Sequence, residues 1–527
     1  MTQRMKCAGR FVMILLVCPF AGFEVSGQIS AEKLERFLAD EARIETSALQ
    51  FPLEVKHFYK KLQHRLVWQE NSASRNFLFS LLKQSADYGL KENDYQPDRV
   101  QSINTYGLQL RRLEDSIIAE VQLTDALIHF LHDVVYGNSP VVPGYNGLNY
   151  IPACFDIPSS LADAVTKNNL PALLTNFEQN SPEYDSLKQL IKAYNKILTS
   201  NGFSESRVTS AIVSITNKPL MLNLFHLGFL DSATQKISEK ELRARVKAAQ
   251  RSFNLLVDGV LRSTALEALN APLANRLSEL NSAINTVRWL NCIKLSQKII
   301  VVNIPSATLL VYDNGHVILE SRIIVGKRST PTPTLSSKIT EVILYPYWMA
   351  PYSIATKELL PAIKRNIGFL DANGYQVINN QGKVIDPYKI NWQALSTSNF
   401  PYIIRESTGC DNALGLVKLN FYNPYSVYLH DTPDKSLFSF NKRYFSHGCM
   451  RVEKAMDLAR LVLKNNNIAI DTLEAKGCLY NQKPITVLAD EIIPVFVVYN
   501  TAWIDSTGRV TFSEDIYRKN QFNRQEN

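Results

Sequence analysis

The sequence lacks the patterns that would mark several common classes of function. It has no glycine-rich loop of the kind that cradles phosphate, so use of a nucleotide is not expected. Its 57 lysines and arginines form no basic stripe with interleaved aromatic residues, which argues against a nucleic-acid partner despite a net charge of +8. No cysteine pair has the C-x₂₋₄-C spacing of a structural zinc site. These absences favour a protein that needs no metal and no other cofactor.

Long apolar runs are also absent beyond the N-terminus. Residues 1–27 carry a basic start, the short apolar stretch 11–23 and then the small residues Val25-Ser26-Gly27, which is the pattern of a secretory signal peptide. The apolar stretch is too short to span a bilayer comfortably, so we expect cleavage and a periplasmic location. An uncleaved inner-membrane anchor is the alternative. Proximity to a membrane is the only membrane relation that the sequence predicts.

Cysteine is scarce, with seven residues, and two of them lie in the predicted signal peptide. An odd number remains in the exported chain, so at least one thiol is free unless a bridge joins two chains. Cys449 is the natural candidate for the free thiol, and the pairing of the others cannot be read from the sequence. The five remaining residues are Cys154, Cys292, Cys410, Cys449 and Cys478.

The residues that are present describe a multidomain α+β protein. Hydrophobic residues make up 46% and charged residues 20% of the 527 residues, and this length suggests about three domains. Helical periodicity dominates the first half, whereas β-branched runs and the turn Asp313-Asn314-Gly315 mark a mainly β second half. The predicted segments are a helical scaffold at 28–217, a three-helix unit at 218–271, a connecting helix at 272–295, a β domain at 296–518 with a capping (lid) insertion at 353–414, and a disordered tail at 519–527.

Capping signals place several helix starts. Thr124 is the expected N-cap of a helix at 123–136. Within the three-helix unit, Ser238-x-x-Glu241 has the pattern of a capping box that opens the second helix, and Thr264-x-x-Glu267 is expected to open the third.

The stretch around Cys449 carries the strongest chemical signal. An apolar stripe at helical spacing over residues 455–462 predicts a helix just beyond this cysteine. Free N–H groups at the start of that helix would favour the thiolate, and Arg451 would add a nearby cation. The same N–H groups could later receive an oxyanion.

A histidine within reach would complete a nucleophile–base pair. Tyr428 and His430 stand two residues apart on a predicted strand, which places both side chains on one face. His447 and Cys449 have the same spacing, so spacing alone does not choose between the two histidines. A metal site built from both histidines, Cys449 and Cys410 is disfavoured, because no ligand pair has a usual spacing.

The three-helix unit resembles the peptidoglycan-binding domain of cell-wall enzymes. An ordinary three-helix bundle is the plain alternative, since capping boxes and apolar stripes are generic. The resemblance rests on Val246-x₃-Gln250-x₂-Phe253, Asp258-Gly-Val260 and Thr264-x-x-Glu-Ala-Leu269-Asn270.

Six phrases of the second half together resemble the L,D-transpeptidases with a YkuD-type catalytic domain, in the long scaffolded (YcbB-like) subgroup. Met450 departs from the family pattern, in which an aliphatic residue is usual, and the N-terminal scaffold matches only loosely. The phrases are Asn303-Ile-Pro-Ser306, Ile324-Val-Gly-Lys327, Pro331-Thr-Pro333, Pro346-Tyr-Trp348, Asn423-Pro-Tyr-Ser-Val-Tyr-Leu-His-Asp-Thr-Pro433 and Ser446-His-Gly-Cys-Met-Arg-Val452.

The resemblance implies a cysteine acyltransferase that forms 3→3 cross-links in peptidoglycan. In such enzymes the thiolate attacks the carbonyl after the third stem residue and expels the terminal D-alanine of a donor tetrapeptide. The side-chain amine of a second stem then takes the acyl group. Donor and acceptor stem peptides are the implied partners, and penems or carbapenems are the implied acylating inhibitors.

Site residues follow from the same resemblance by position. It makes Cys449 the nucleophile and His430 the general base, oriented through the backbone carbonyl of Asp431. Tyr428, with backbone N–H groups near Gly448 and Cys449, would hold the oxyanion. The implied substrate-binding or supporting residues are Ser446, His447, Arg451 and Trp348.

Two other activities stay open. Water could resolve the thioacyl intermediate, which would give an L,D-carboxypeptidase or endopeptidase acting on the same stems. An inert catalytic domain would instead leave a non-catalytic peptidoglycan-binding scaffold, and the intact set of Cys449, His430 and Tyr428 argues against that. The sequence does not encode which acceptor is used.

Overall fold

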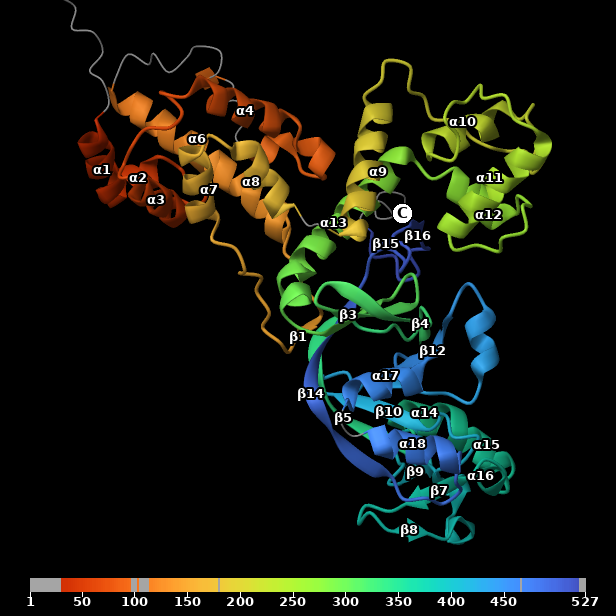
Figure 1. Cartoon of the computed structure of the whole chain (residues 1–527). Helices are drawn as coiled ribbons and strands as arrows, with labels where there is room; N and C mark the ends of the chain where they lie inside the picture. The colour runs from red at the N-terminus through yellow and green to blue at the C-terminus, as the bar shows by residue number, and fades with distance from the viewer. Residues whose placement is uncertain (1–29, 96–101, 104–112, 179–180, 465–466, 521–527) are drawn as a thin grey trace, which may run out of the picture.

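The structure, a computed structural model, describes residues 30–95, 102–103, 113–178, 181–464 and 467–520, and it joins a helical half to a β-rich half (Figure 1). The predicted signal peptide at 1–27 and residues 521–527 of the predicted tail lie outside the described residues. Lys519 and Asn520, predicted to begin a disordered tail, donate their backbone N–H groups to the Asp515 carboxylate at 2.9 Å. Among the described helices, none is long and apolar enough to cross a membrane.

The helices of the scaffold pack around one apolar core. Thr124 is not an N-cap, because the predicted helix is only the second half of a longer helix, α6 (Leu113–Tyr136). Its buried hydroxyl lies 2.7 Å from the Tyr59 hydroxyl and accepts from Trp68 Nε1 at 2.8 Å. The N-cap prediction failed because a threonine inside a helix can also precede an apolar run. The other scaffold helices are α1 (Ala31–Ala39), α2 (Glu41–Thr46), α3 (Pro52–Lys61), α4 (Ser72–Lys83), α7 (Ile157–Thr166) and α8 (Leu170–Phe177).

The three-helix unit consists of α10 (Lys218–His226), α11 (Glu239–Ser252) and α12 (Ser263–Leu269). The capping box of α11 is confirmed: Ser238 Oγ accepts from Glu241 N at 3.2 Å, and the Glu241 carboxylate accepts from Ser238 N at 2.8 Å. The third helix does start near Thr264, but α12 already includes Ser263 and has no side-chain cap.

This unit does not have a core of its own. It shares one with α9 (Pro182–Leu198), with α13 (Leu273–Ser296) and with the hairpin of β15 (Ala502–Ile504) and β16 (Val510–Phe512). Helix α13 covers the predicted connecting segment and contacts α6, α9 and β3. Helix α13, green in Figure 1, therefore joins the scaffold, the three-helix unit and the β domain.

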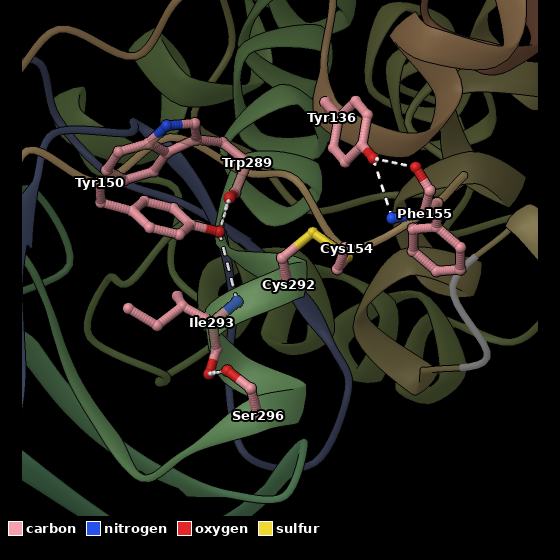
Figure 2. Close-up of a disulfide and its surroundings, with 8 residues drawn as sticks. All are labelled: Tyr136, Tyr150, Cys154, Phe155, Trp289, Cys292, Ile293 and Ser296. Carbon is pink, nitrogen blue, oxygen red and sulfur yellow. Dashed lines mark hydrogen bonds between the residues drawn. A yellow bond between two sulfur atoms is a disulfide. The ribbon is translucent and has the colours of Figure 1, made fainter. Parts of the chain in front are cut away.

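A disulfide between Cys154 and Cys292 fastens the segment after α6 to α13 (Figure 2). Beside it, the Tyr150 hydroxyl donates to the Trp289 carbonyl at 2.9 Å and accepts from Ile293 N at 3.3 Å. A second disulfide joins Cys410 to Cys478. Cys449 is the free cysteine of the described residues.

These disulfides give a direct chemical prediction. In the unfolded, unreduced protein, iodoacetamide should modify Cys449 and leave Cys154, Cys292, Cys410 and Cys478 intact, because the latter have no thiol. After reduction all five should react. Peptide mapping by mass spectrometry measures this, and alkylation of Cys154 or Cys410 before reduction would contradict the pairing.

The β domain is built on one large mixed sheet that closes on itself. Its strand order is β1-β5-β10-β11-β13-β4-β3-β2-β14, and β14 also pairs with β5, while β12 pairs with β4. One face holds an apolar core that includes residues of α17 (Ala455–Val462) and α18 (Asn467–Lys476). The strands are β1 (Tyr145–Asn146), β2 (Ile299–Asn303), β3 (Thr308–Asp313), β4 (His316–Gly326), β5 (Leu335–Leu344), β10 (Val417–Phe421), β11 (Leu429–His430), β12 (Tyr444–Ser446), β13 (Met450–Val452) and β14 (Ile485–Val498).

The predicted tight turn joins β3 to β4 as a hairpin. Asn314 and Gly315 both have positive φ angles, 47° and 82°, as a type I′ turn requires. Asparagine and glycine adopt this backbone conformation at little cost, which is why the sequence signal was reliable.

The lid predicted at 353–414 is a small subdomain with its own apolar core. Its sheet has the order β6-β9-β7-β8 and starts before the predicted boundary. The Cys410–Cys478 disulfide fastens the end of the lid to the segment after α18. Its elements are β6 (Trp348–Met349), α14 (Tyr352–Ile354), the π-helical turn η3 (Ala355–Leu359), α15 (Leu360–Arg365), α16 (Phe369–Ala372), β7 (Tyr375–Ile378), β8 (Val384–Ile385) and β9 (Ile403–Glu406).

Candidate active site

Two neighbouring strands bring the candidate residues onto one face of the sheet. Strand β11 runs parallel to β13, with Leu429 opposite Met450 and His430 opposite Arg451. Leu429 and Met450 are buried in the apolar core, so strand alternation turns His430 and Arg451 to the other face. Tyr428 and Cys449 stand two residues before this second pair and share its face.

Tyr428 is the direct neighbour of the Cys449 thiol. Its hydroxyl and its backbone N–H are placed to hydrogen-bond the Cys449 sulfur, and the thiol also lies 4.0 Å from the Ser426 carbonyl oxygen. Its carbonyl accepts from Met450 N at 3.0 Å, which fixes the two segments side by side. The Tyr428 ring centroid lies 5.6 Å from that of His430 in a T-shaped contact. Burial raises the pKa of Tyr428, so its hydroxyl remains a neutral donor.

The prediction that Cys449 precedes a helix start is wrong. Residues 450–452 form β13, and α17 begins only at Ala455. The apolar stripe was real, but β4 and β11 recruit the residues between it and the cysteine into the sheet. Burial raises the pKa of the Cys449 thiol, while hydrogen bonds from Tyr428 and the charges of Lys418 and Arg451 oppose that rise. The thiolate is therefore not stabilised by a helix dipole.

His430 is a buried, neutral histidine, with 4% of its surface exposed. Its Nδ1 lies 2.6 Å from the Asp431 carbonyl oxygen, the contact that the family resemblance implies. With Nδ1–H donating there, Nε2 carries the lone pair that a base needs. Burial, followed by the charge of Arg451, lowers the pKa of His430 to about 3. The Asp431 carboxylate points elsewhere: it pairs with Lys435 Nζ at 2.5 Å and accepts from Leu416 N at 3.0 Å.

The turn before Cys449 is held by Ser446. Its buried hydroxyl donates to the Cys449 carbonyl at 2.6 Å and accepts from Gly448 N at 3.2 Å. These bonds make Ser446 a residue that shapes the turn, and its predicted part in substrate binding stays a prediction. Gly448 has a φ angle of 118°, which disfavours any residue with a Cβ. Because the Gly448 N–H already has a partner, it is not free to receive an oxyanion.

The remaining predicted residues are His447, Trp348 and Arg451. His447 is exposed, and its Nε2 lies 3.2 Å from Glu358 Oε1 of the lid and 3.4 Å from Lys327 Nζ. Trp348 belongs to the lid sheet, where its ring centroid lies 6.4 Å from that of Tyr375. Arg451 lies on the face of the sheet that carries His430, in line with its predicted supporting place.

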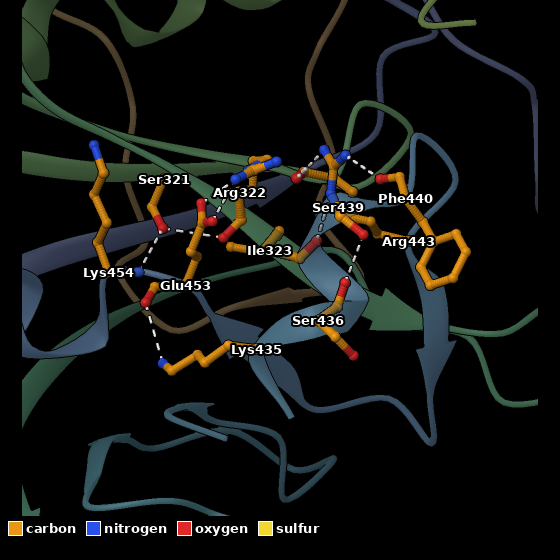
Figure 3. Close-up of polar contacts among 11 residues, drawn as sticks. Ser321, Arg322, Ile323, Lys435, Ser436, Ser439, Phe440, Arg443, Glu453 and Lys454 are labelled. Atoms are coloured by element: carbon orange, nitrogen blue, oxygen red, sulfur yellow. Dashed lines mark hydrogen bonds and ion pairs between the residues drawn. The ribbon is translucent and has the colours of Figure 1, made fainter. Parts of the chain in front are cut away.

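A polar network behind the turn anchors the chain from Lys435 to Lys454 on β4 (Figure 3). The buried guanidinium of Arg443 donates to the carbonyls of Ser306, Ala307, Ile323, Phe440 and Asn441. Arg322 pairs with Glu453 at 2.5 Å, and Lys454 N donates to Ser321 Oγ at 3.1 Å. These bonds hold β13, and with it Cys449, in register against β4.

Sequence reasoning missed Lys418. The alternation Val417-Lys418-Leu419 showed that this lysine faces away from the core, which was a usable signal. Its neighbours were not readable, because the antiparallel register of β10 and β11 places it opposite His430.

The fold and the site together define a class of protein. A free thiol, a phenol and a neutral histidine gather on one face of a sheet, as acyl transfer through a cysteine requires. Residues 297–470 match the family described as the L,D-transpeptidase catalytic domain (YkuD), and residues 53–191 match the Scaffold domain. The chain therefore carries a YkuD-type L,D-transpeptidase catalytic domain, from a family of cysteine-dependent acyltransferases, preceded by a scaffold domain.

Relatives agree with this family. A putative L,D-transpeptidase of Haemophilus influenzae is 40% identical over 221 residues, which is 41% of this chain and 44% of that protein. The chain thus spans less than half the length of this curated relative. Solved structures of L,D-transpeptidases from Mycobacterium smegmatis (16% identity, TM-score 0.18, 38% of this chain and 58% of that one) and Stackebrandtia nassauensis (13%, 0.20, 56% and 98%) are also similar. At such low TM-scores these likenesses do not bear on function.

Proposed function

We propose that this chain is a periplasmic L,D-transpeptidase that forms 3→3 peptidoglycan cross-links through a thioacyl intermediate on Cys449. The observation that carries the proposal is the shared sheet face of Cys449, Tyr428 and His430, with Tyr428 hydrogen-bonded to the sulfur, inside a YkuD-type domain. The basic and apolar pattern of residues 1–27 supports export.

The first half-reaction makes the thioester. His430 Nε2 takes the thiol proton, and the Cys449 sulfur attacks the carbonyl carbon that links the third stem residue to the terminal D-alanine. The carbonyl oxygen becomes an oxyanion, which the Tyr428 hydroxyl and the Cys449 N–H can receive; this N–H has no acceptor among the described residues. The C–N bond then breaks, and D-alanine leaves with the proton held by His430.

The second half-reaction transfers the acyl group. The side-chain amine of the third residue of another stem attacks the thioester carbonyl, and His430 accepts a proton from that amine. When the C–S bond breaks, the proton returns to the sulfur and the two third residues are joined by an amide. The same intermediate gives a free tripeptide if water attacks instead. The strained carbonyl of a penem or carbapenem should also acylate Cys449.

Product analysis tests this function. The full chain incubated with disaccharide-tetrapeptide should yield a dimer whose mass equals two donors less one D-alanine. Tripeptide monomers without dimers would replace the proposal by an L,D-carboxypeptidase. The absence of any product, together with no mass increase after treatment with a penem, would leave a non-catalytic wall-binding scaffold.

A further inference from the structure

The free thiol of this site lacks the two usual sources of thiolate stabilisation. No helix begins at Cys449, because β13 follows it directly. His430 is buried among cations, so a standing imidazolium–thiolate pair is disfavoured in the resting protein. Another group must therefore favour the anion, since a neutral thiol is a poor nucleophile.

Lys418 on β10 occupies the position that such a group needs. It stands opposite His430 in the antiparallel register, while its neighbours Val417 and Leu419 point into the core. The Lys418 ammonium lies 4.0 Å from the centroid of the Tyr428 ring. The hydroxyl of that ring hydrogen-bonds the Cys449 sulfur. The Tyr428 phenol therefore contacts the Lys418 ammonium through its ring and the Cys449 thiol through its hydroxyl. A cation over a phenol ring makes its hydroxyl a stronger donor.

The charge of Lys418 is not neutralised by a carboxylate. Among the described residues, no carboxylate lies within ion-pairing distance of its ammonium, although the lysine is half-buried. Glu341 faces it from β5, but the Glu341 carboxylate accepts from Asn420 Nδ2 at 2.7 Å. Arg451 is in a comparable position, because Asp434 acts on its charge as Glu341 acts on the charge of Lys418. The groups that act on the thiol are Tyr428 just before β11, Lys418 on β10 and Arg451 on β13. Other charged or titratable groups act on these cations or exchange charge effects with them: His430 on β11, Glu341 on β5, and Asp434 and Lys435 after β11.

We propose that Lys418 is a positioning residue that stabilises the thiolate of Cys449 when it forms, acting through its own charge and through the Tyr428 hydroxyl. The role deepens the proposed function, on which its catalytic meaning rests, but the ionisation of the thiol can be measured without any substrate. Lys418 gives up no proton in this role. It lowers the free energy of the Cys449 thiolate, so transfer of the thiol proton to His430 costs less free energy.

Alkylation of the full chain by iodoacetamide tests the inference. This reagent is neutral and carries no carboxylate that the Lys418 ammonium could bind, so its rate reports the ionisation of the thiol. The rate of Cys449 modification is measured against pH by peptide mapping. In Lys418→Met the midpoint should rise by about one pH unit, which makes alkylation near neutral pH about tenfold slower. Lys418→Arg should keep the midpoint within a few tenths of a unit, because the charge is retained.

The experiment also needs a control lysine variant and a check that each variant is folded. Lys338→Met removes an exposed lysine from the neighbouring strand β5 and should not move the midpoint, because solvent and salt screen that charge. Thermal unfolding of each variant checks that the fold persists. An unchanged midpoint in Lys418→Met, or equal shifts in the Met and Arg variants, overturns the inference.

Cross-linking assays on the same variants separate the two proposals. If Lys418→Met alkylates normally but no longer cross-links, the lysine binds a substrate carboxylate instead, and the inference fails while the transpeptidase function stands. If the midpoint shifts as expected but the wild-type chain makes no dimer, the role of Lys418 in thiol ionisation stands and the proposed function fails.

Discussion

Replacement of Cys449 by alanine is expected to abolish cross-link formation, with a loss of about 10⁴-fold or more in turnover. The reason is that the described structure holds no second free thiol and places Cys449, beside Tyr428, on the face that carries His430. Without the sulfur no thioester forms, and neither D-alanine release nor penem acylation should occur. Mass spectrometry of stem peptides and of the intact protein measures both.

Cys449→Ser is the partner variant. It keeps the size and a hydroxyl nucleophile but loses the acidity of the thiol, so it should be strongly impaired and yet fold like the wild type. Unchanged thermal unfolding in both variants shows that chemistry and not folding was lost. Dimer formation by Cys449→Ala at more than about one per cent of the wild-type rate would remove Cys449 as the nucleophile.

The second large effect concerns His430. Its replacement by glutamine should slow thioester formation by about 10²- to 10⁴-fold, because the neutral Nε2 lone pair that takes the thiol proton is lost. His447→Gln should cost clearly less, since the His447 imidazole is exposed and its Nε2 contacts the lid residue Glu358. The rate of acylation by a penem compares the two. A larger loss in His447→Gln would reverse their assignment.

His430 also predicts a pH dependence of stability. Its pKa is about 3 in the folded protein because burial disfavours the cation, whereas an unfolded histidine titrates near its ordinary value. Between these values the unfolded chain binds one proton more, so stability falls as pH falls, by at most about 1.4 kcal/mol per pH unit. His430→Gln should show a shallower decline over this window in denaturant unfolding. An equal slope would mean that His430 is not buried neutral.

Much of the site could be predicted from the sequence because its parts are local. Tyr428 and His430 stand two residues apart in one segment, the turn from Ser446 to Cys449 is continuous in sequence, and Asn314-Gly315 needs a backbone conformation that few residues tolerate. Such features depend on neighbours in the chain, so residue type and spacing were enough to place them. The Ser238 capping box was predictable for the same reason.

Errors occurred where distant segments compete for the same residues. Residues 450–452 bond to β4 and β11, which removes Cys449 from the helix start that the stripe at 455–462 suggested. Thr124 lies inside α6 because Tyr59 and Trp68 supply partners for its buried hydroxyl. Neither contact is encoded in the local pattern.

The sequence by itself identified the groups that we propose carry the chemistry: a free thiol, a phenol and a histidine. Only the tertiary structure decided how they are tuned. The register of β10 against β11 sets Lys418 beside Tyr428, and burial makes His430 neutral. Strand register and burial depend on which segments meet across the sheet, and hydrogen bonding and electrostatics act only once they have met.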